Sequence, residues 1–252
     1  MWQLLLMTMI VFAVEKPREI EKMVVTEHLG AQFPVESIFR WEDGHQGPVR
    51  LVRPTIFVFA YYECPMLCTL VLNGLVQALE KMHLVLGKDY DVITLSIDAR
   101  EMPELARQKK NNLLAKRRVD PAGWHFLTAS EQIIRLTADT LGFPFSYDAR
   151  HDQFIHPALI IVLTAQGRIA RYLYGTEFVA QDLDFAIKEA RQGTIAKETV
   201  LDRVLLFCFH FDPSKNHYIL NVWRIVQIVI SIQVIVMALF LIILWRPTWI
   251  KK

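Results

Sequence analysis

Two cysteines lie four positions apart in this chain, at Cys64 and Cys68. A thiol becomes a strong nucleophile and a soft metal ligand once it has lost its proton. The apolar segment 55–62 before the pair is typical of a buried strand, and Pro65 suits the first turn of a helix. Free N–H groups and the dipole at a helix start stabilise a negative sulfur. We therefore expect Cys64 to have a lowered pKa.

The thiol pair admits three kinds of chemistry: a structural disulfide, a redox couple or a metal site. A disulfide is the usual state of paired cysteines in small exported domains. A link across so short a loop, however, would constrain the unfolded chain little. Two positions four apart share one helical face if both are helical. The three intervening residues also leave room for both sulfurs to bind one ion, so all three interpretations stay open on the pair alone.

The elements around the pair alternate between strands and helices. We expect strands at 55–62, 90–97, 124–127, 157–164 and 168–174. We expect helices at 65–86, 101–118, 130–141 and 182–191. A short hairpin is expected within 32–52, with its turn at Trp41-Glu42-Asp43-Gly44. This order predicts an α/β fold, a thioredoxin-like three-layer domain over 29–195 with the thiol pair between a strand and the following helix.

His156 is the second residue with metal chemistry, because it lies directly before the strand expected at 157–164. In a thioredoxin-like fold, the loop that enters this strand packs beside the cysteine turn. Two thiolates and one imidazole in a mostly apolar site suit a soft ion, and Cu(I) fits best. An isolated histidine is more often a capping or packing residue. Its place opposite Cys64 and Cys68 favours a metal ligand here.

A second apolar region lies near the C-terminus. The segment 225–245 carries no charge and is long enough to span a bilayer as a helix. We predict a transmembrane helix at 222–245, after a juxtamembrane segment at 196–221. Arg246, Lys251 and Lys252 follow the span, so the positive-inside rule places the tail 246–252 in the cytoplasm and the main domain on the extracytoplasmic, periplasmic side.

The N-terminal segment 1–14 is apolar and resembles the core of an export signal, followed by a lead-in at 15–28. The formal net charge of +2 is too small to imply a nucleic-acid partner, and an exported domain would not meet one. The sequence contains no zinc-protease motif, phosphate loop or dinucleotide fingerprint.

Four other residues could take part in such chemistry. Met66 could offer a thioether to copper, but an exposed or gap-filling methionine is more common. Cys208 and His210 could form a second soft-metal pair, although an unrelated free cysteine and histidine are the favoured interpretation. Asp98 follows the strand at 90–97 and could tune the charge of the site, but capping of the next helix is favoured.

These features together resemble the Sco/SenC/PrrC family of membrane-tethered copper-handling proteins. The resemblance runs from about Leu29 to Arg191. It rests on Cys-x3-Cys with a histidine some 90 residues later, and on the segments Phe-Ala-Tyr-Tyr-Glu-Cys-Pro-Met-Leu-Cys, Leu-Ser-Ile-Asp and Gly-Trp-His-Phe-Leu-Thr at 59–68, 95–98 and 123–128. Thr69 and Ile155 stand where the family often has proline and aspartate, and the predicted anchor is C-terminal instead of N-terminal.

The resemblance implies a thioredoxin fold whose copper ligands are Cys64, Cys68 and His156. It also implies delivery of copper, or of reducing equivalents, to the copper centre of cytochrome c oxidase during assembly. We therefore read the chain as a membrane-anchored extracytoplasmic copper chaperone holding Cu(I), with Cu(II) left open. The expected partner is the copper-bearing oxidase subunit or another cuproprotein, and lipid holds the C-terminal helix.

Chaperoning needs no substrate turnover, so the chain is read as a metal chaperone and not as an enzyme. The alternative is a thiol-disulfide oxidoreductase that keeps the cysteines of the oxidase copper site reduced, with Cys64 and Cys68 as redox thiols. A scaffold with a structural disulfide is the third interpretation.

Overall fold

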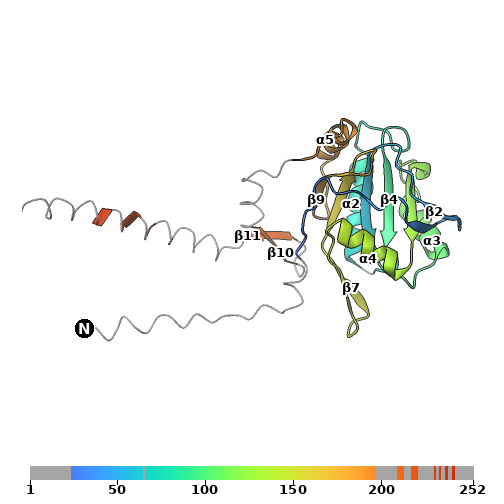
Figure 1. The fold of residues 1–252 in the computed structure, drawn as a ribbon, viewed down its shortest axis with the longest axis horizontal. Coiled ribbons are helices and arrows are strands. Elements are labelled where there is room, and N and C mark those ends of the chain that lie inside the picture. The colour runs from blue at the N-terminus through green and yellow to red at the C-terminus, as the bar shows by residue number, and fades with distance from the viewer. Residues whose placement is uncertain are drawn as a thin grey trace, which may run out of the picture. The chain divides into compact units, whose positions relative to one another are not determined.

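The computed structural model describes residues 24–64, 66–196, 209–212 and 217–220, together with six helical positions between 230 and 241 (Figure 1). The chain divides into two compact units, residues 1–196 and residues 197–252. The first unit contains every residue of the predicted α/β domain.

A seven-stranded sheet in the order β2-β1-β5-β4-β3-β8-β9 forms the centre of the first unit. Its strands are β1 (Ile38–Trp41), β2 (Gln46–Pro48), β3 (Thr55–Ala60), β4 (Asp91–Ser96), β5 (Trp124–Thr128), β8 (Leu159–Leu163) and β9 (Ile169–Tyr174). β3, β4 and β5 run parallel, whereas β8 is antiparallel to both β3 and β9. The predicted hairpin in 32–52 is confirmed as β1 and β2.

Helices cover both faces of this sheet. They are α2 (Leu67–Leu79), α3 (Pro103–Leu114), α4 (Glu131–Thr140) and α5 (Ala180–Arg191). The connections through α2 and α3 cross the sheet in the same direction, so right-handed crossovers place both on one face. α5 contacts α2 on that face. The return from β5 to β8 carries α4 across the other face, in front of the sheet in Figure 1. The predicted three-layer α/β arrangement is confirmed.

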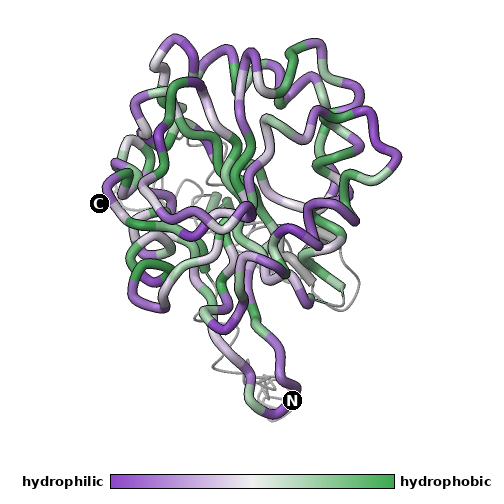
Figure 2. Tube along the Cα trace, turned by 90° about the vertical axis from the view of Figure 1, so that its right-hand side faces the viewer, coloured by the Kyte–Doolittle hydropathy of each residue, from purple (hydrophilic) through white to green (hydrophobic). Residues whose placement is uncertain are grey.

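The core lies between these layers, and the central strands consist mostly of hydrophobic residues, drawn green in Figure 2. Every residue of β3 and of β8 is buried. Such continuous apolar runs are expected of strands that helices cover on both faces. Gly74 lets α2 approach the loop after β9, because a Cβ at this position would lie 1.8 Å from the carbonyl oxygen of Thr176.

The register of the sheet brings three loops to one edge. Ala60 pairs with Ser96 in the parallel ladder, so β3 and β4 end side by side. Phe57 pairs with Ile161 in the antiparallel ladder, so β8 begins where β3 ends. The segments that follow β3, follow β4 and precede β8 therefore meet. These segments carry the thiol pair, Asp98 and His156 respectively.

The cysteine helix is shorter than the sequence predicted. We expected it to run from residue 65 to residue 86, but α2 ends at Leu79. The carboxylate of Asp184 accepts hydrogen bonds from the backbone N–H groups of His83 and Leu84, at 3.2 and 3.3 Å. This tertiary contact competes with continuation of the helix, and local sequence does not reveal it.

A second small sheet was not predicted. The strands β6 (Ser146–Asp148) and β7 (Gln153–Ile155) form an antiparallel hairpin that leads directly into His156. Both strands have three residues, too few for an alternating pattern to indicate them. The hairpin matters because it carries the predicted histidine ligand.

In the second unit, β10 (Phe209–Asp212) and β11 (His217–Leu220) form an antiparallel hairpin. Among the described residues, no continuous helix has the length and hydropathy that a bilayer crossing requires. Most of the predicted span 222–245 lies outside the described residues, as do Cys208, the signal-like segment 1–14 and the tail 246–252.

Candidate metal centre

The three predicted ligands come together at the sheet edge described above. The Cys68 Sγ atom lies 3.0 Å from Nε2 of His156, although 88 positions separate the two residues. The backbone N–H of Cys68 donates a hydrogen bond to the Cys64 Sγ atom at 3.3 Å. Cys64, Cys68 and His156 are 7%, 1% and 7% exposed. Both cysteines are free thiols, so this state holds no disulfide between them.

The turn after β3 sets the positions of the two sulfurs. α2 begins at Leu67 with Met66 as its N-cap, so Cys64 precedes the helix and Cys68 lies in its first turn. Only Cys68 is helical, so the condition under which the two cysteines would share a helical face is not met. The backbone N–H of Tyr61 donates to the Cys68 Sγ atom at 3.5 Å, so the Cys68 sulfur points back toward the end of β3. Met66 is 68% exposed, which agrees with leaving it out of the site.

In its neutral form, the His156 ring directs an unprotonated nitrogen, Nε2, at the Cys68 sulfur. Its Nδ1 atom lies 2.9 Å from the carbonyl oxygen of Pro157, which can only accept a hydrogen bond. Nδ1 must therefore carry the proton in the neutral ring, and Nε2 keeps its lone pair toward Cys68. Metal-ligating histidines are commonly held in this way by a backbone carbonyl.

Aromatic side chains enclose the imidazole. The rings of Phe143 and Tyr61 lie 5.8 and 6.4 Å from it, and the Phe154 ring packs against Tyr61 at 5.4 Å. Such a shell limits the access of water, which favours soft-ion chemistry at the sulfurs.

The two thiols have opposite protonation tendencies. A hydrogen bond from the Cys68 thiol lowers the pKa of Cys64 far below its usual value, despite the opposing effect of burial. Burial raises the pKa of Cys68, and the neighbouring Cys64 sulfur raises it further. The expected lowering at Cys64 has the right direction. The N–H of Cys68 at the helix start contributes, but the partner thiol contributes most.

The donor set suits a soft ion once the site opens slightly. Two ligands that bind one ion at about 2.0–2.3 Å lie about 3.5–3.8 Å apart. The sulfur–nitrogen distance of 3.0 Å is a hydrogen-bond distance and must lengthen by more than about half an ångström. In the described ranges, no group of three or more His, Cys, Asp or Glu side chains has an arrangement that could hold a metal ion.

Sequence reasoning missed Glu101, which was assigned to the start of a helix. α3 begins only at Pro103, and the 4% exposed Glu101 side chain turns inward to the cysteine turn. Its carboxylate accepts the backbone N–H groups of Tyr62 and Glu63, at 2.7 and 3.0 Å. The sequence carries no signal for this role, because the burial of Glu101 depends on partners from β4 and from the segment after β3.

Asp98 neither caps α3 nor touches the sulfurs. Its carboxylate pairs with the guanidinium of Arg100, with contacts of 2.7 to 3.0 Å. Met102 is the N-cap of α3. The favoured capping role of Asp98 is therefore wrong, because the charge of Arg100 two positions later captures its carboxylate.

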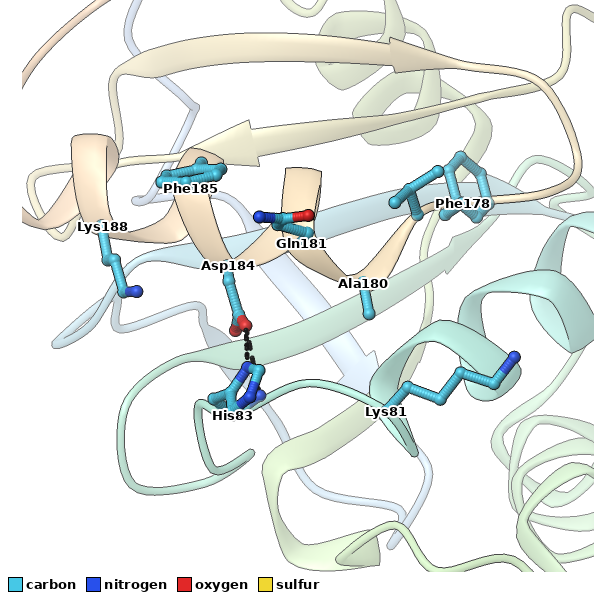
Figure 3. A pocket seen from close by; sticks show the side chains of 9 residues that line it. Lys81, His83, Phe178, Ala180, Gln181, Asp184, Phe185 and Lys188 are labelled. Carbon is cyan, nitrogen blue, oxygen red and sulfur yellow. Dashed lines mark hydrogen bonds and ion pairs between the residues drawn. The ribbon is translucent and has the colours of Figure 1, made fainter.

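A second histidine site lies at the other end of α2 (Figure 3). There, Nδ1 of His83 lies 3.0 Å from the Asp184 carboxylate, at the edge of a hollow of about 740 Å³. Lys81, Lys188 and Phe185 also line this hollow. It contains no thiol, and α2, with 13 residues, separates it from Cys68.

No protein-family model and no curated protein matches this chain. Solved structures do match. A candidate electron transfer protein from Aquifex aeolicus VF5 is 24% identical with a TM-score of 0.59, and the match covers 65% of this chain and 95% of that protein. ScoI from Arabidopsis thaliana, solved with copper bound, is 20% identical with a TM-score of 0.52, over 65% of this chain and 99% of that one.

A third similar structure is BsSco, described as a member of the Sco family of cytochrome c oxidase assembly proteins and as containing a disulfide switch. It is 18% identical with a TM-score of 0.52, and the match covers 66% of this chain and 96% of that protein. At these identities the likeness concerns the fold. The mixed α/β, thioredoxin-like fold of Sco structures, expected from the sequence, is confirmed.

Proposed function

We propose that this chain is a Sco-type copper chaperone that binds Cu(I) through Cys64, Cys68 and His156. It delivers the ion to a copper-bearing subunit of cytochrome c oxidase during assembly, or to another cuproprotein. The observation that carries the proposal is the 3.0 Å approach of His156 Nε2 to the Cys68 Sγ atom, in a buried site that also contains Cys64. The solved structures with this fold include Sco proteins, among them ScoI from Arabidopsis thaliana with copper bound.

The protonation of the site explains how it takes up a univalent ion. The lowered pKa of Cys64 and the raised pKa of Cys68 give one thiolate and one thiol. A histidine binds a metal ion only as the neutral ring, so the site that takes up the ion carries a net charge of −1. Replacing the Cys68 proton with Cu(I) leaves this charge unchanged. A divalent ion would bring the buried net charge to zero, but the two sulfurs are soft ligands, and their softness suits Cu(I). The site therefore favours Cu(I), and binding releases about one proton.

Transfer to an acceptor proceeds by ligand exchange. Thiolates and imidazoles of the acceptor replace those of this chain one at a time, so no bare ion enters water. The exposed Met66 lies between the two cysteines on the outer side of the turn, where an acceptor would approach. The imidazole is the neutral ligand, and it comes from the separate β6–β7 hairpin, so we expect it to leave first.

The proposal includes the location. A C-terminal transmembrane helix at 222–245 would hold the domain at the outer, periplasmic face of the cell membrane, where an acceptor subunit is accessible. The uncharged sequence 225–245 and the basic residues after it support this part of the proposal.

The test is Cu(I) binding by the full-length protein, measured under reducing, anaerobic conditions by competition with a Cu(I) chelator. We expect one ion per chain, with two sulfur ligands and one nitrogen ligand in X-ray absorption spectra. His156→Ala should reduce the affinity sharply and remove the nitrogen ligand. His83→Ala is the matched control and should change neither. Unchanged affinity in His156→Ala would exclude the three-ligand site.

The second candidate is a thiol-disulfide oxidoreductase, which the lowered pKa of Cys64 favours. The Cys64 thiolate would attack a partner disulfide, forming a mixed disulfide and releasing one partner thiolate. Cys68, on losing its proton, would then attack the Cys64 sulfur and release the second. Two electrons pass to the partner, and this chain ends with a Cys64–Cys68 disulfide. Reduction of a partner that survives in His156→Ala would favour this function.

A further inference from the structure

We propose that the loop after β4 positions both halves of the metal site, through Glu101 on the cysteine side and Arg100 on the histidine side. This inference rests on the proposed function, because it assigns residues that set the geometry of the same site. Both residues line a hollow of about 510 Å³ that also borders Glu63 and Asp152. Glu63 immediately precedes Cys64, and Asp152 belongs to the turn of the β6–β7 hairpin.

Glu101 holds the cysteine side. Its Oε1 atom accepts the backbone N–H groups of Tyr62 and Glu63, and its Oε2 atom accepts Tyr62 N–H and the hydroxyl of Ser96. Tyr62 and Glu63 are the residues that lead from β3 into Cys64. A carboxylate with all these partners fixes the backbone immediately before the first ligand. The phenol of Tyr62 adds a second anchor through the carbonyl of Leu127, at 2.6 Å.

Arg100 holds the histidine side. Its guanidinium lies 5.2 Å from the centre of the Tyr147 ring and 3.7 Å from the Asp152 carboxylate. Tyr147 is the middle residue of β6, and its hydroxyl donates to the Asp152 carboxylate. The other side of the guanidinium is fixed by Asp98, which is itself buried. Arg100 therefore connects the end of β4 to the hairpin that carries His156.

The two connections differ in stiffness. Glu101 is 4% exposed, whereas the side chains of Arg100 and Asp152 are 64% and 77% exposed. Exposed ion pairs contribute little to stability and break easily. A buried carboxylate with several hydrogen-bond partners is costly to displace. The gap between sulfur and nitrogen must open for an ion to enter. We therefore expect the hairpin with His156 to move, while Glu101 keeps the cysteine turn in place.

The experiment compares Glu101→Gln and Arg100→Gln in the full-length protein with two matched controls. Glu104→Gln changes an exposed acid on the first turn of α3 that lines the same hollow. Arg150→Gln changes an exposed arginine in the turn of the hairpin. The first measurement uses the metal-free protein and records the ¹⁵N NMR shifts of the His156 imidazole, which report its tautomer and its contact with Cys68.

We expect Glu101→Gln to shift the His156 Nε2 signal, to reduce Cu(I) affinity about ten- to hundredfold and to weaken the nitrogen contribution in X-ray absorption spectra. Arg100→Gln should shift the same signal and reduce affinity a few-fold. Both controls should match the wild type. If Glu101→Gln does not fold, as judged by circular dichroism, Arg100→Gln against Arg150→Gln decides the inference.

If both Glu101→Gln and Arg100→Gln keep the wild-type NMR shifts of His156, the positioning role is refuted, irrespective of their Cu(I) affinity. A wild-type protein that binds no Cu(I) would instead refute the proposed function. The metal-free NMR comparison would then still decide whether the loop positions His156 against the thiols.

Discussion

Two histidines lie near opposite ends of α2 and show how a proposed metal ligand differs from a histidine in a surface ion pair. His156 is 7% exposed and faces a thiol within an aromatic shell. The side chain of His83 is 92% exposed and faces the buried carboxylate of Asp184. Each ring nitrogen lies 3.0 Å from its partner, so distance does not distinguish the two sites.

Enclosure and the chemistry of the partners make the difference. At His156, two sulfurs and a bare nitrogen converge with little water, so a soft ion gains more from these ligands than from solvent. At His83, water already solvates the ring, and the Asp184 carboxylate also accepts hydrogen bonds from the backbone N–H groups of His83 and Leu84. The first site has the donors and the enclosure that the proposed copper site requires, whereas the second pairs an exposed ring with a carboxylate just after the end of α2.

The largest expected effect concerns the thiol that touches His156. Cys68→Ser replaces a soft ligand with a hydroxyl that stays protonated near neutral pH. We expect Cu(I) affinity to fall by more than about a thousandfold, beyond the ten- to hundredfold loss typical of outer-shell partners. Chelator competition measures this, with His83→Ala as the reference. If Cys68→Ser and His83→Ala lost similar Cu(I) affinity, the assignment of copper binding to the His156 end of α2 would be refuted.

The next prediction concerns the pH dependence of thiol reactivity in the metal-free protein. A free cysteine with a pKa of about 8.5 loses about two-hundredfold in alkylation rate between pH 8 and pH 5.5. Because the pKa of Cys64 is lowered far below that value, its thiolate persists at pH 5.5 and its rate should stay nearly constant. Mass spectrometry of the iodoacetamide adducts gives both rates. A two-hundredfold fall at Cys64 would contradict the assigned protonation.

At the other end of α2, Asp184→Asn should affect stability and not copper. The buried carboxylate accepts two backbone N–H groups, and loss of one partner of a buried hydrogen bond costs about 1–3 kcal/mol. Urea unfolding at pH 7 measures the loss, and Cu(I) affinity should remain that of the wild type. A drop in affinity would show that the two sites are coupled through α2.

The same pair predicts a pH dependence of the free energy of unfolding. Burial raises the pKa of Asp184, but hydrogen bonds from His83 and Leu84 outweigh it and lower the pKa below its usual value. Its contribution is therefore fully present above the unfolded pKa of about 3.9 and is lost as pH falls through the lower folded value. The difference in free energy of unfolding between the wild type and Asp184→Asn should decrease as the pH falls from the unfolded pKa through the folded pKa. Urea titrations at several pH values measure this difference. A constant gap would argue that the carboxylate is not specially stabilised.

The smallest effect should come from the His83 ring itself. Because this side chain is 92% exposed, His83→Ala should change the free energy of unfolding by no more than about 0.5 kcal/mol. Urea unfolding checks this value. A loss as large as that of Asp184→Asn would show that the ring, and not the backbone N–H of His83, is what Asp184 stabilises.

The order of elements was largely readable from the sequence because each signal is local. The apolar run before Cys64 predicted β3, and the alternation of apolar strands with helices predicted the layers. The ends of elements were less readable. We expected α2 to continue to residue 86, but it ends at Leu79. The carboxylate that competes with its continuation belongs to Asp184, about 100 positions away, and no local pattern reveals it.

The sequence by itself determined which donors are available: two thiols at a fixed spacing and a histidine before an apolar strand. The tertiary structure decided what surrounds them. The antiparallel register of β8 on β3 brings His156 to the thiols, and a three-residue hairpin strand, too short to be read from a pattern, carries it there. The buried Glu101 fixes the backbone before Cys64 through hydrogen bonds that no local pattern encodes, because their partners come from different strands. Residue types and their spacing indicate which atoms could bind an ion. Strand register and burial determine the distances between these atoms and their protonation.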